Sequence, residues 1–175
     1  RKEGTAQDYG NLGGVYYIRG ELDKAFEYYQ KALTLNEILD RKVGMADAYS
    51  NLGVIYQTRN DLDKAYEYHQ KSLALNENLG RKEGMALNYG NIGVVYQSRV
   101  NLDKAVEYFK KALSLNESLG RKEGITQDHI NLGNVYKQQG HTEQAKQAYL
   151  KSIELFKALG NPTMVKKVQG LLDAL

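Results

Sequence analysis

The chain has 175 residues, a formal net charge of +3 at pH 7, and no cysteine. A net charge this small gives no argument for a nucleic-acid partner, and the lack of cysteine excludes disulfides and thiolate metal sites. The sequence has no apolar run as long as a signal peptide or a membrane span, so we expect no membrane association and a cytoplasmic location.

One six-residue pattern, Asn-(Leu/Ile)-Gly-x-(Val/Ile)-Tyr, occurs four times at a spacing of 40 residues. It begins at Asn11, Asn51, Asn91 and Asn131. Self-similarity at a fixed period of roughly 20–50 residues is typical of stacked-repeat proteins. The chain therefore divides into four repeats, residues 1–40, 41–80, 81–120 and 121–160, and a tail at 161–175. Because it begins where a repeat begins, we expect it to be part of a longer array.

Each repeat contains two apolar patterns of helical period, separated by a short break. In the second repeat these patterns predict a first helix near residues 43–58 and a second near residues 62–79. Neither helix can bury its apolar stripe alone, whereas stacked helix pairs bury both stripes. The expected fold is all-α, a right-handed α-solenoid of four helix-turn-helix repeats.

Residues that favour helix ends flank these patterns. The Asn-Asp pair at 60–61 can accept hydrogen bonds from the free amides of the second helix, and Gly80 can end that helix. The positions equivalent to Gly80 are Gly120, Gly160 and, without a glycine, Asp40. In the tail, Asn161 followed by Pro162 predicts the start of a capping helix that covers the fourth repeat.

A glycine recurs inside each predicted first helix, although glycine costs about 1 kcal/mol there relative to alanine. These glycines are Gly13, Gly53, Gly93 and Gly133. We expect them to allow close approach of the second helix. The small partners expected on that helix are Ala25, Ala65, Ala105 and Ala145. A phosphate-binding loop is a poor alternative, because amides in the middle of a helix are committed to its hydrogen bonds.

Most of the 14 tyrosines fall into columns of the repeat. One aromatic column consists of Tyr29, His69, Phe109 and Tyr149. We expect these side chains to pack in the core and between helices, and we interpret His69 as a packed histidine. An aromatic cage for a ligand is the alternative.

Residues 49–73 read Tyr-Ser-Asn-Leu-Gly-Val-Ile-Tyr-Gln-Thr-Arg-Asn-Asp-Leu-Asp-Lys-Ala-Tyr-Glu-Tyr-His-Gln-Lys-Ser-Leu, which looks like a tetratricopeptide repeat. The other repeats match as well, so the resemblance covers residues 1–160. The usual spacing in that family is about 34 residues, and the proline that often ends its second helix is replaced here by Glu37, Glu77 and Glu117. The longer spacing resembles kinesin light chains, spindle-orientation adaptors of the Pins type, and bacterial regulatory proteins.

The resemblance implies a protein-interaction module whose first helices line a concave groove for an extended peptide. The asparagines Asn11, Asn51, Asn91 and Asn131 would lie in this groove. The remaining groove positions are Gln7, Asp47, Leu87, Gln127, Gly10, Ser50, Gly90, Ile130, Gly14, Val54, Val94, Asn134, Tyr17, Gln57, Gln97 and Lys137. We expect specificity to come from these varied positions.

The asparagine column suits a peptide ligand, because an amide side chain both donates and accepts hydrogen bonds. Neighbouring helices pack about 8–10 Å apart and an extended chain rises about 3.3 Å per residue, so one asparagine would meet about every third ligand residue. The alternative is that the asparagines bond to neighbouring helices and orient the stack.

Three arginines recur at the ends of the first helices and could favour an acidic ligand: Arg19, Arg59 and Arg99. The chain lacks the lysines and arginines with which some members of the family hold chaperone tails, since Ser50, Val54 and Leu87 are not cationic. No catalytic set, metal-ligand spacing or cofactor motif is apparent, so we expect no enzyme activity. Two alternatives are self-association of the repeats as a homo-oligomer and a sensor arm of a larger signalling enzyme or transcription regulator.

Overall fold

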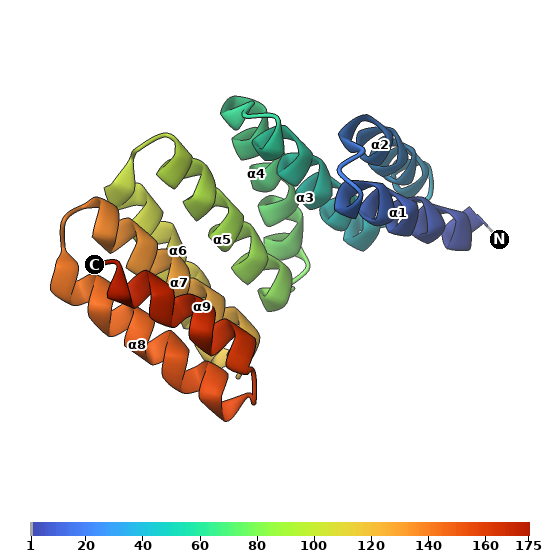
Figure 1. Ribbon diagram of the computed structural model, residues 1–175. Coiled ribbons are helices and arrows are strands. Elements are labelled where there is room, and N and C mark those ends of the chain that lie inside the picture. The colour runs from blue at the N-terminus through green and yellow to red at the C-terminus, as the bar shows by residue number, and fades with distance from the viewer. Residues whose placement is uncertain (1) are drawn as a thin grey trace. The chain divides into compact units, whose positions relative to one another are not determined.

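The computed structural model describes residues 2–175, the first two by their backbone alone, and this part of the chain contains nine helices and no strand (Figure 1). The helices are α1 (Lys2–Ile18), α2 (Leu22–Ile38), α3 (Lys42–Thr58), α4 (Leu62–Asn78), α5 (Lys82–Ser98), α6 (Leu102–Ser118), α7 (Lys122–Gln138), α8 (Thr142–Ala158) and α9 (Pro162–Asp173). Each repeat supplies one helix pair, so the predicted all-α helix-turn-helix architecture is confirmed.

The helices form two compact units, residues 1–91 and residues 92–175, and the boundary lies inside α5. In unit 1, α1 packs on α2, α2 on α3, and α3 on α4. In unit 2, α6 packs on α7, α7 on α8, and α8 on α9. Contacts between consecutive helices are typical of a solenoid, in which each repeat packs mainly on its neighbours.

The second helices end as predicted. Gly80 has φ +65°, its N–H donates to the Glu77 carbonyl at 3.0 Å, and the Arg81 N–H donates to the Asn76 carbonyl at 2.9 Å. These bonds satisfy carbonyls that the helix leaves open, and glycine takes the left-handed conformation at little cost. Of the two predicted caps, Asp61 performs the role, since its side chain accepts from the Lys64 N–H.

The glycines inside the first helices do allow close approach, but their neighbours differ from the predicted ones. A Cβ built on Gly53 would lie 2.6 Å from Cε1 of the His69 ring, and one built on Gly133 would lie 2.5 Å from Cε1 of Tyr149. The predicted partner Ala65 is fully buried, but the nearest atoms to Gly53 belong to the ring. The nearest neighbour of the glycine in each repeat is therefore a flat aromatic ring rather than the predicted alanine.

A second layer of glycines, which the sequence reasoning missed, covers buried asparagines. The glycines are Gly44, Gly84 and Gly124, and the asparagines beneath them are Asn36, Asn76 and Asn116. Nδ2 of Asn76 donates to Oδ1 of Asn88 at 2.9 Å, and Nδ2 of Asn116 donates to Oδ2 of Asp128 at 2.7 Å. These polar pairs lie between consecutive repeats, where a buried amide needs a partner.

Half-buried tyrosines pack between the helices of a pair, as predicted. The rings of Tyr16 and Tyr28 stack with their centroids 5.2 Å apart. Lys24 Nζ lies 5.1 Å from the centroid of Tyr16, and Lys31 Nζ lies 5.0 Å from that of Tyr28. Such lysines shield the aromatic faces while keeping their charge in water.

The tail forms the predicted capping helix. Oδ1 of Asn161 accepts from the Met164 N–H at 3.1 Å, and Pro162 occupies the first helical position. Val168 of α9 is fully buried in a cluster with Ile130, and Figure 1 shows α9 lying along α8. Ile130 was predicted to lie in the groove, but it is buried because α9 occupies the place that a further first helix would take.

At the other end of the repeat series, α1 keeps an apolar face exposed. Leu12 and Val15 are 40% and 45% exposed, whereas Leu52 and Ile55 at the same positions of the next repeat are fully buried. In unit 1 those two residues pack on α2. The self-association alternative would use such a face, and it stays a prediction.

Candidate functional site

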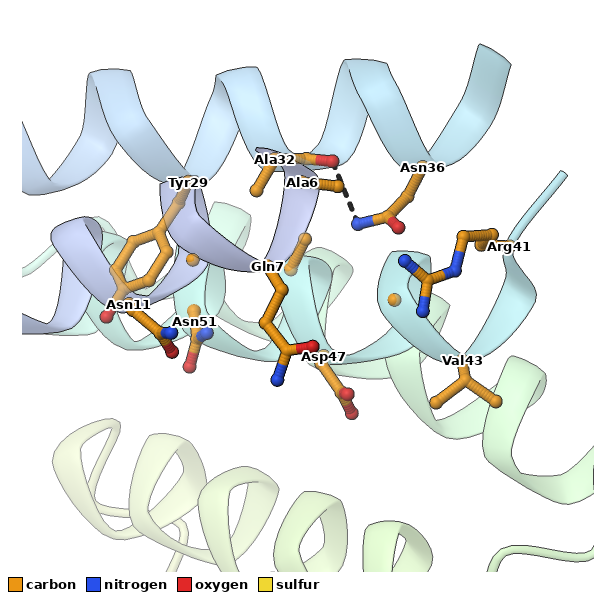
Figure 2. Close-up of a pocket in the computed structure, with 13 residues that line it drawn as sticks. Ala6, Gln7, Asn11, Tyr29, Ala32, Asn36, Arg41, Val43, Asp47 and Asn51 are labelled. Atoms are coloured by element: carbon orange, nitrogen blue, oxygen red, sulfur yellow. Dashed lines mark hydrogen bonds between the residues drawn. The ribbon is translucent and has the colours of Figure 1, made fainter. Parts of the chain in front are cut away.

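A concave pocket of about 340 Å³ lies within unit 1, and α1, α2 and α3 all contribute to its lining. Figure 2 shows these side chains from close by. The pocket-lining residues are Ala6, Gln7, Gly10, Asn11, Tyr29, Ala32, Asn36, Arg41, Val43, Gly44, Asp47, Ala48 and Asn51. The first helices of two consecutive repeats thus contribute to one hollow, together with α2.

One end of the pocket carries neutral polar groups. Asn11, Asn51 and Tyr29 lie at this end (Figure 2). No side-chain hydrogen bond joins Asn11 or Asn51 to any residue that the structure describes, so both amides keep donors and acceptors available to a ligand. The Tyr29 ring is only 6% exposed, and burial raises the pKa of its phenol, so that it remains a neutral donor at neutral pH.

The other end of the pocket contains charged and constrained side chains. Arg41 and Val43 line it (Figure 2). Oδ1 of Asp47, a predicted groove residue, accepts from Nη1 of Arg81 at 3.0 Å. Nδ2 of Asn36 donates to the Ala32 carbonyl at 2.9 Å. Asp47 is therefore already paired within the fold, whereas the amides at the opposite end are not.

The other groove predictions in unit 1 concern Ser50, Val54 and Gln57, which are half-buried on α3. They are not among the residues that line the pocket. The Val54 carbonyl accepts from the Thr58 hydroxyl at 2.9 Å within the same helix. Asn91 is half-buried on α5 at the end of unit 1. The structure thus brings Asn11, Asn51 and Asp47 together around the pocket and leaves these four outside it.

In unit 2 the polar groove residues form side-chain hydrogen bonds within that unit, whereas Val94 is half-buried on α5. Nε2 of Gln97 in α5 donates to Oε1 of Gln138 in α7 at 3.2 Å. Oδ1 of Asn131 accepts from Gln127 at 3.0 Å, and Oδ1 of Asn134 accepts from the Tyr149 hydroxyl at 2.7 Å. Lys137 Nζ donates to the Ala174 carbonyl at 2.9 Å.

The recurring arginines do not form one site. Arg59 pairs with Asp23 at 2.5 Å and lies over the Phe26 ring, 5.1 Å from its centroid. Its guanidinium therefore joins α2 to the end of α3 within unit 1. Arg19 and Arg99 are exposed and directly follow the last residues of α1 and α5, respectively. The acidic-ligand prediction for the three arginines remains untested.

A model of the tetratricopeptide repeat family matches the sequence in three overlapping windows, residues 4–78, 44–118 and 84–158. These windows cover most of the chain and coincide with the repeats whose helix pairs the structure contains. The chain belongs to the tetratricopeptide repeat family. A search of curated proteins finds no match to the sequence.

Solved structures share the tetratricopeptide architecture seen here. BtubC (BKLC) from P. vanneervenii aligns with a TM-score of 0.78 and 26% identity, over 89% of this chain and 64% of that protein. Aspartyl phosphate phosphatase F from Bacillus subtilis aligns with a TM-score of 0.90 and 15% identity, over 97% and 44%. The apo form of RapI aligns with a TM-score of 0.86 and 19% identity, over 95% and 61%.

These likenesses have definite limits. The chain spans between 44% and 64% of the length of the three proteins. One of them is named as a phosphatase, but at 15% identity its likeness shows the fold alone. Residues 2–175 contain no helix that is both long and apolar enough to cross a membrane.

The buried titratable groups of this tetratricopeptide chain lie in packing positions. His69 is fully buried against Gly53, as predicted, and burial lowers its pKa to about 4. Burial raises the pKa of Asp128 to about 6, although the bond from Asn116 and the nearby charge of Arg121 act in the opposite direction. No group of three metal-ligating side chains occurs among the residues that the structure describes.

The sequence reasoning missed the contribution of the second helix to the pocket. Tyr29, Ala32 and Asn36 of α2 line it together with the first helices. Tyr29 was predicted to pack in the core, with an aromatic cage for a ligand as the alternative, and its ring does pack on Gly13. The sequence did contain a signal for this contribution. Gly14, which follows Gly13 and lies about one turn beyond Asn11, has no side chain to cover the Tyr29 phenol.

Proposed function

We propose that this chain is a non-enzymatic protein-interaction scaffold, and that the pocket of unit 1 binds an extended peptide or disordered segment. Membership of the tetratricopeptide family supports the scaffold role. The single observation that carries the proposal is the presence of Asn11 and Asn51 in one pocket with no side-chain bonds to the described residues. A peptide backbone offers one donor and one acceptor per residue, which two amides can meet.

The pocket has the dimensions and the chemistry for binding a short stretch of chain. Its volume of about 340 Å³ lies at the lower end of the range found for ligand pockets. On α1 its lining consists of Ala6, Gln7, Gly10 and Asn11, all small or neutral, so a ligand backbone can come close to this helix. The lining supplies hydrogen-bond partners rather than a nucleophile beside a base, which favours binding over catalysis.

A peptide selection tests this proposal directly. We would select a phage-displayed library of random 12-residue peptides on the whole chain and measure the affinity of each selected peptide. Replacing both pocket amides, Asn11→Ala with Asn51→Ala, should weaken binding about tenfold or more, because two neutral hydrogen bonds are lost. The melting temperature should hold or rise slightly, since alanine is the better helix former.

The matched control is Asn78→Ala, the same chemical change at an exposed position of a second helix, α4. This variant should bind the selected peptides as the unchanged chain does. If the double variant unfolds, the asparagines are structural and the proposal fails. It fails equally if the double variant binds with full affinity, because the ligand then lies elsewhere.

A further inference from the structure

The aromatic column of the repeats varies in polar character from repeat to repeat. The four side chains are Tyr29, His69, Phe109 and Tyr149, and each ring packs on the glycine of its own repeat. A Cβ built on Gly13 would lie 2.6 Å from two ring carbons of Tyr29, so the ring has little freedom to move. The two phenols therefore extend in fixed directions.

Unit 2 reveals what such a phenol does when a partner is present. The Tyr149 hydroxyl donates to Oδ1 of Asn134 at 2.7 Å. Asn134 lies one position after the glycine on which Tyr149 packs, Gly133. Within unit 2, then, the repeat itself supplies an amide carbonyl oxygen to the phenol.

Unit 1 has the phenol but lacks that acceptor. Gly14 occupies the position equivalent to Asn134, and a Cβ built on it would lie 3.7 Å from the Tyr29 hydroxyl oxygen with no other atom within 4 Å. Tyr29 is only 6% exposed, and it lines the pocket. Its hydroxyl has no hydrogen-bond partner among the described residues. The oxygen itself is not enclosed and opens on the pocket, so an acceptor of a ligand can reach it.

We propose that the Tyr29 hydroxyl anchors the bound peptide by donating a hydrogen bond to an amide carbonyl oxygen of the ligand. The ligand then supplies what Asn134 supplies in the fourth repeat. This inference rests on the proposed peptide-binding function and names the chemistry that the pocket recognises. Asn11 and Asn51 lie at the same end of the pocket (Figure 2), and their amides can pair with the N–H and C=O groups on either side of that carbonyl.

The anchor belongs to the first repeat alone. At the two middle repeats the aromatic residues are His69 and Phe109, and valines occupy the positions equivalent to Gly14. Neither of those rings carries a hydroxyl. The first repeat is thus where an incoming chain meets a donor fixed by packing, and this contact sets the register of the ligand.

Two substitutions test the anchor: one removes the hydroxyl, and the other gives the hydroxyl an acceptor within the fold. Tyr29→Phe removes only the hydroxyl, and Phe109 in the same column is a precedent for a ring without one. It should weaken binding of the library-selected peptides about two- to tenfold, the effect of one neutral hydrogen bond. Gly14→Asn copies the fourth repeat and gives Tyr29 an internal acceptor, so it should weaken binding about tenfold or more while the melting temperature is kept.

The outcomes separate this inference from the proposed function. If peptides selected on the unchanged chain bind Tyr29→Phe and Gly14→Asn with full affinity, the anchor is refuted and peptide binding stands. If the library yields no peptide that distinguishes the unchanged chain from the Asn11→Ala and Asn51→Ala double variant, both are refuted. Loss of binding to both Tyr29→Phe and Gly14→Asn, with unchanged circular dichroism, supports the anchor.

The source of the carbonyl is resolved by scanning the selected peptide. If a side-chain amide of the ligand supplies it, one asparagine or glutamine of the peptide should be sensitive to alanine. That sensitivity should disappear when the same peptide is measured on Tyr29→Phe, because the two changes remove the same bond. If the ligand backbone supplies it, no single peptide side chain should behave in this way, and replacing one amide by an ester should reproduce the effect. A Tyr29→Phe effect that couples to neither change refutes the proposed bond.

Discussion

Asp128→Asn should stabilise the chain at neutral pH. The Asp128 side chain is only 4% exposed, and its Oδ2 accepts from Nδ2 of Asn116 at 2.7 Å. Burial raises its pKa from 3.8 to about 6, outweighing the opposite effects of Asn116 and Arg121. At neutral pH the fold therefore holds a buried carboxylate that would be more stable in water. Asparagine keeps an acceptor for Asn116 and carries no charge.

The size and sign of the effect follow from the two pKa values. Between pH 3.8 and about 6 the folded chain binds more protons at Asp128 than the unfolded chain does. Stability from this group is therefore fully present below pH 3.8 and is lost as the pH rises through about 6. A difference of about two pKa units corresponds to ~3 kcal/mol. Since Arg121 loses an attractive partner in the variant, we expect a gain of about 1–3 kcal/mol at pH 7.5 and little change at pH 4.

Urea unfolding of the whole chain at the two pH values measures this difference. His69, whose pKa burial lowers to about 4, also titrates in this range, but it is present in both proteins and cancels in the comparison. The mirror variant is Asn88→Asp in unit 1, where Asn88 accepts from Nδ2 of Asn76 at 2.9 Å. It should lose stability at pH 7.5 and recover it at pH 4. An Asp128→Asn chain that is less stable at pH 7.5, or a pH-independent difference, would refute the reasoning.

Two further predictions concern backbone positions and are measured by thermal melting. Gly53→Ala should cost about 1–3 kcal/mol, because its Cβ would lie 2.6 Å from the His69 ring; Gly90→Ala, with nothing within 4 Å, should gain up to about 1 kcal/mol. Equal effects at the two glycines would contradict the packing account. Val100→Gly should stabilise the chain by about 1 kcal/mol, because Val100 has φ +59°, a conformation that Gly140 adopts in the next repeat. No gain there would mean that the valine side chain contributes compensating contacts.

The sequence predicted the fold nearly residue by residue. The helices expected near 43–58 and 62–79 are α3 and α4, Lys42–Thr58 and Leu62–Asn78. The agreement is close because the local signals coincide at each boundary, with Asp61 as a cap and a left-handed Gly80 after the second helix. Repetition strengthens each signal, since four copies carry the same pattern.

The candidate site was predictable only in part. Periodicity assigned Asn11 and Asn51 to one face, and both line the pocket. It gave faces but not distances, so it assigned Ala65 rather than the His69 ring as the neighbour of Gly53. For Tyr29 it predicted packing, with an aromatic cage as the alternative, but it did not predict the position of the hydroxyl, because a column of aromatic residues does not show where one hydroxyl lies.

The repeats serve as internal controls for one another, and this comparison distinguishes packing from function. Positions that are alike in every repeat, such as Gly133 beneath Tyr149, are explained by contacts inside the fold. Where a repeat differs, the structure shows whether the difference is compensated, as when Asn134 accepts from Tyr149. The first repeat keeps the phenol of Tyr29 but has Gly14 in place of that acceptor. The proposed ligand would give this donor, held by packing inside the pocket, the acceptor that the described residues do not supply.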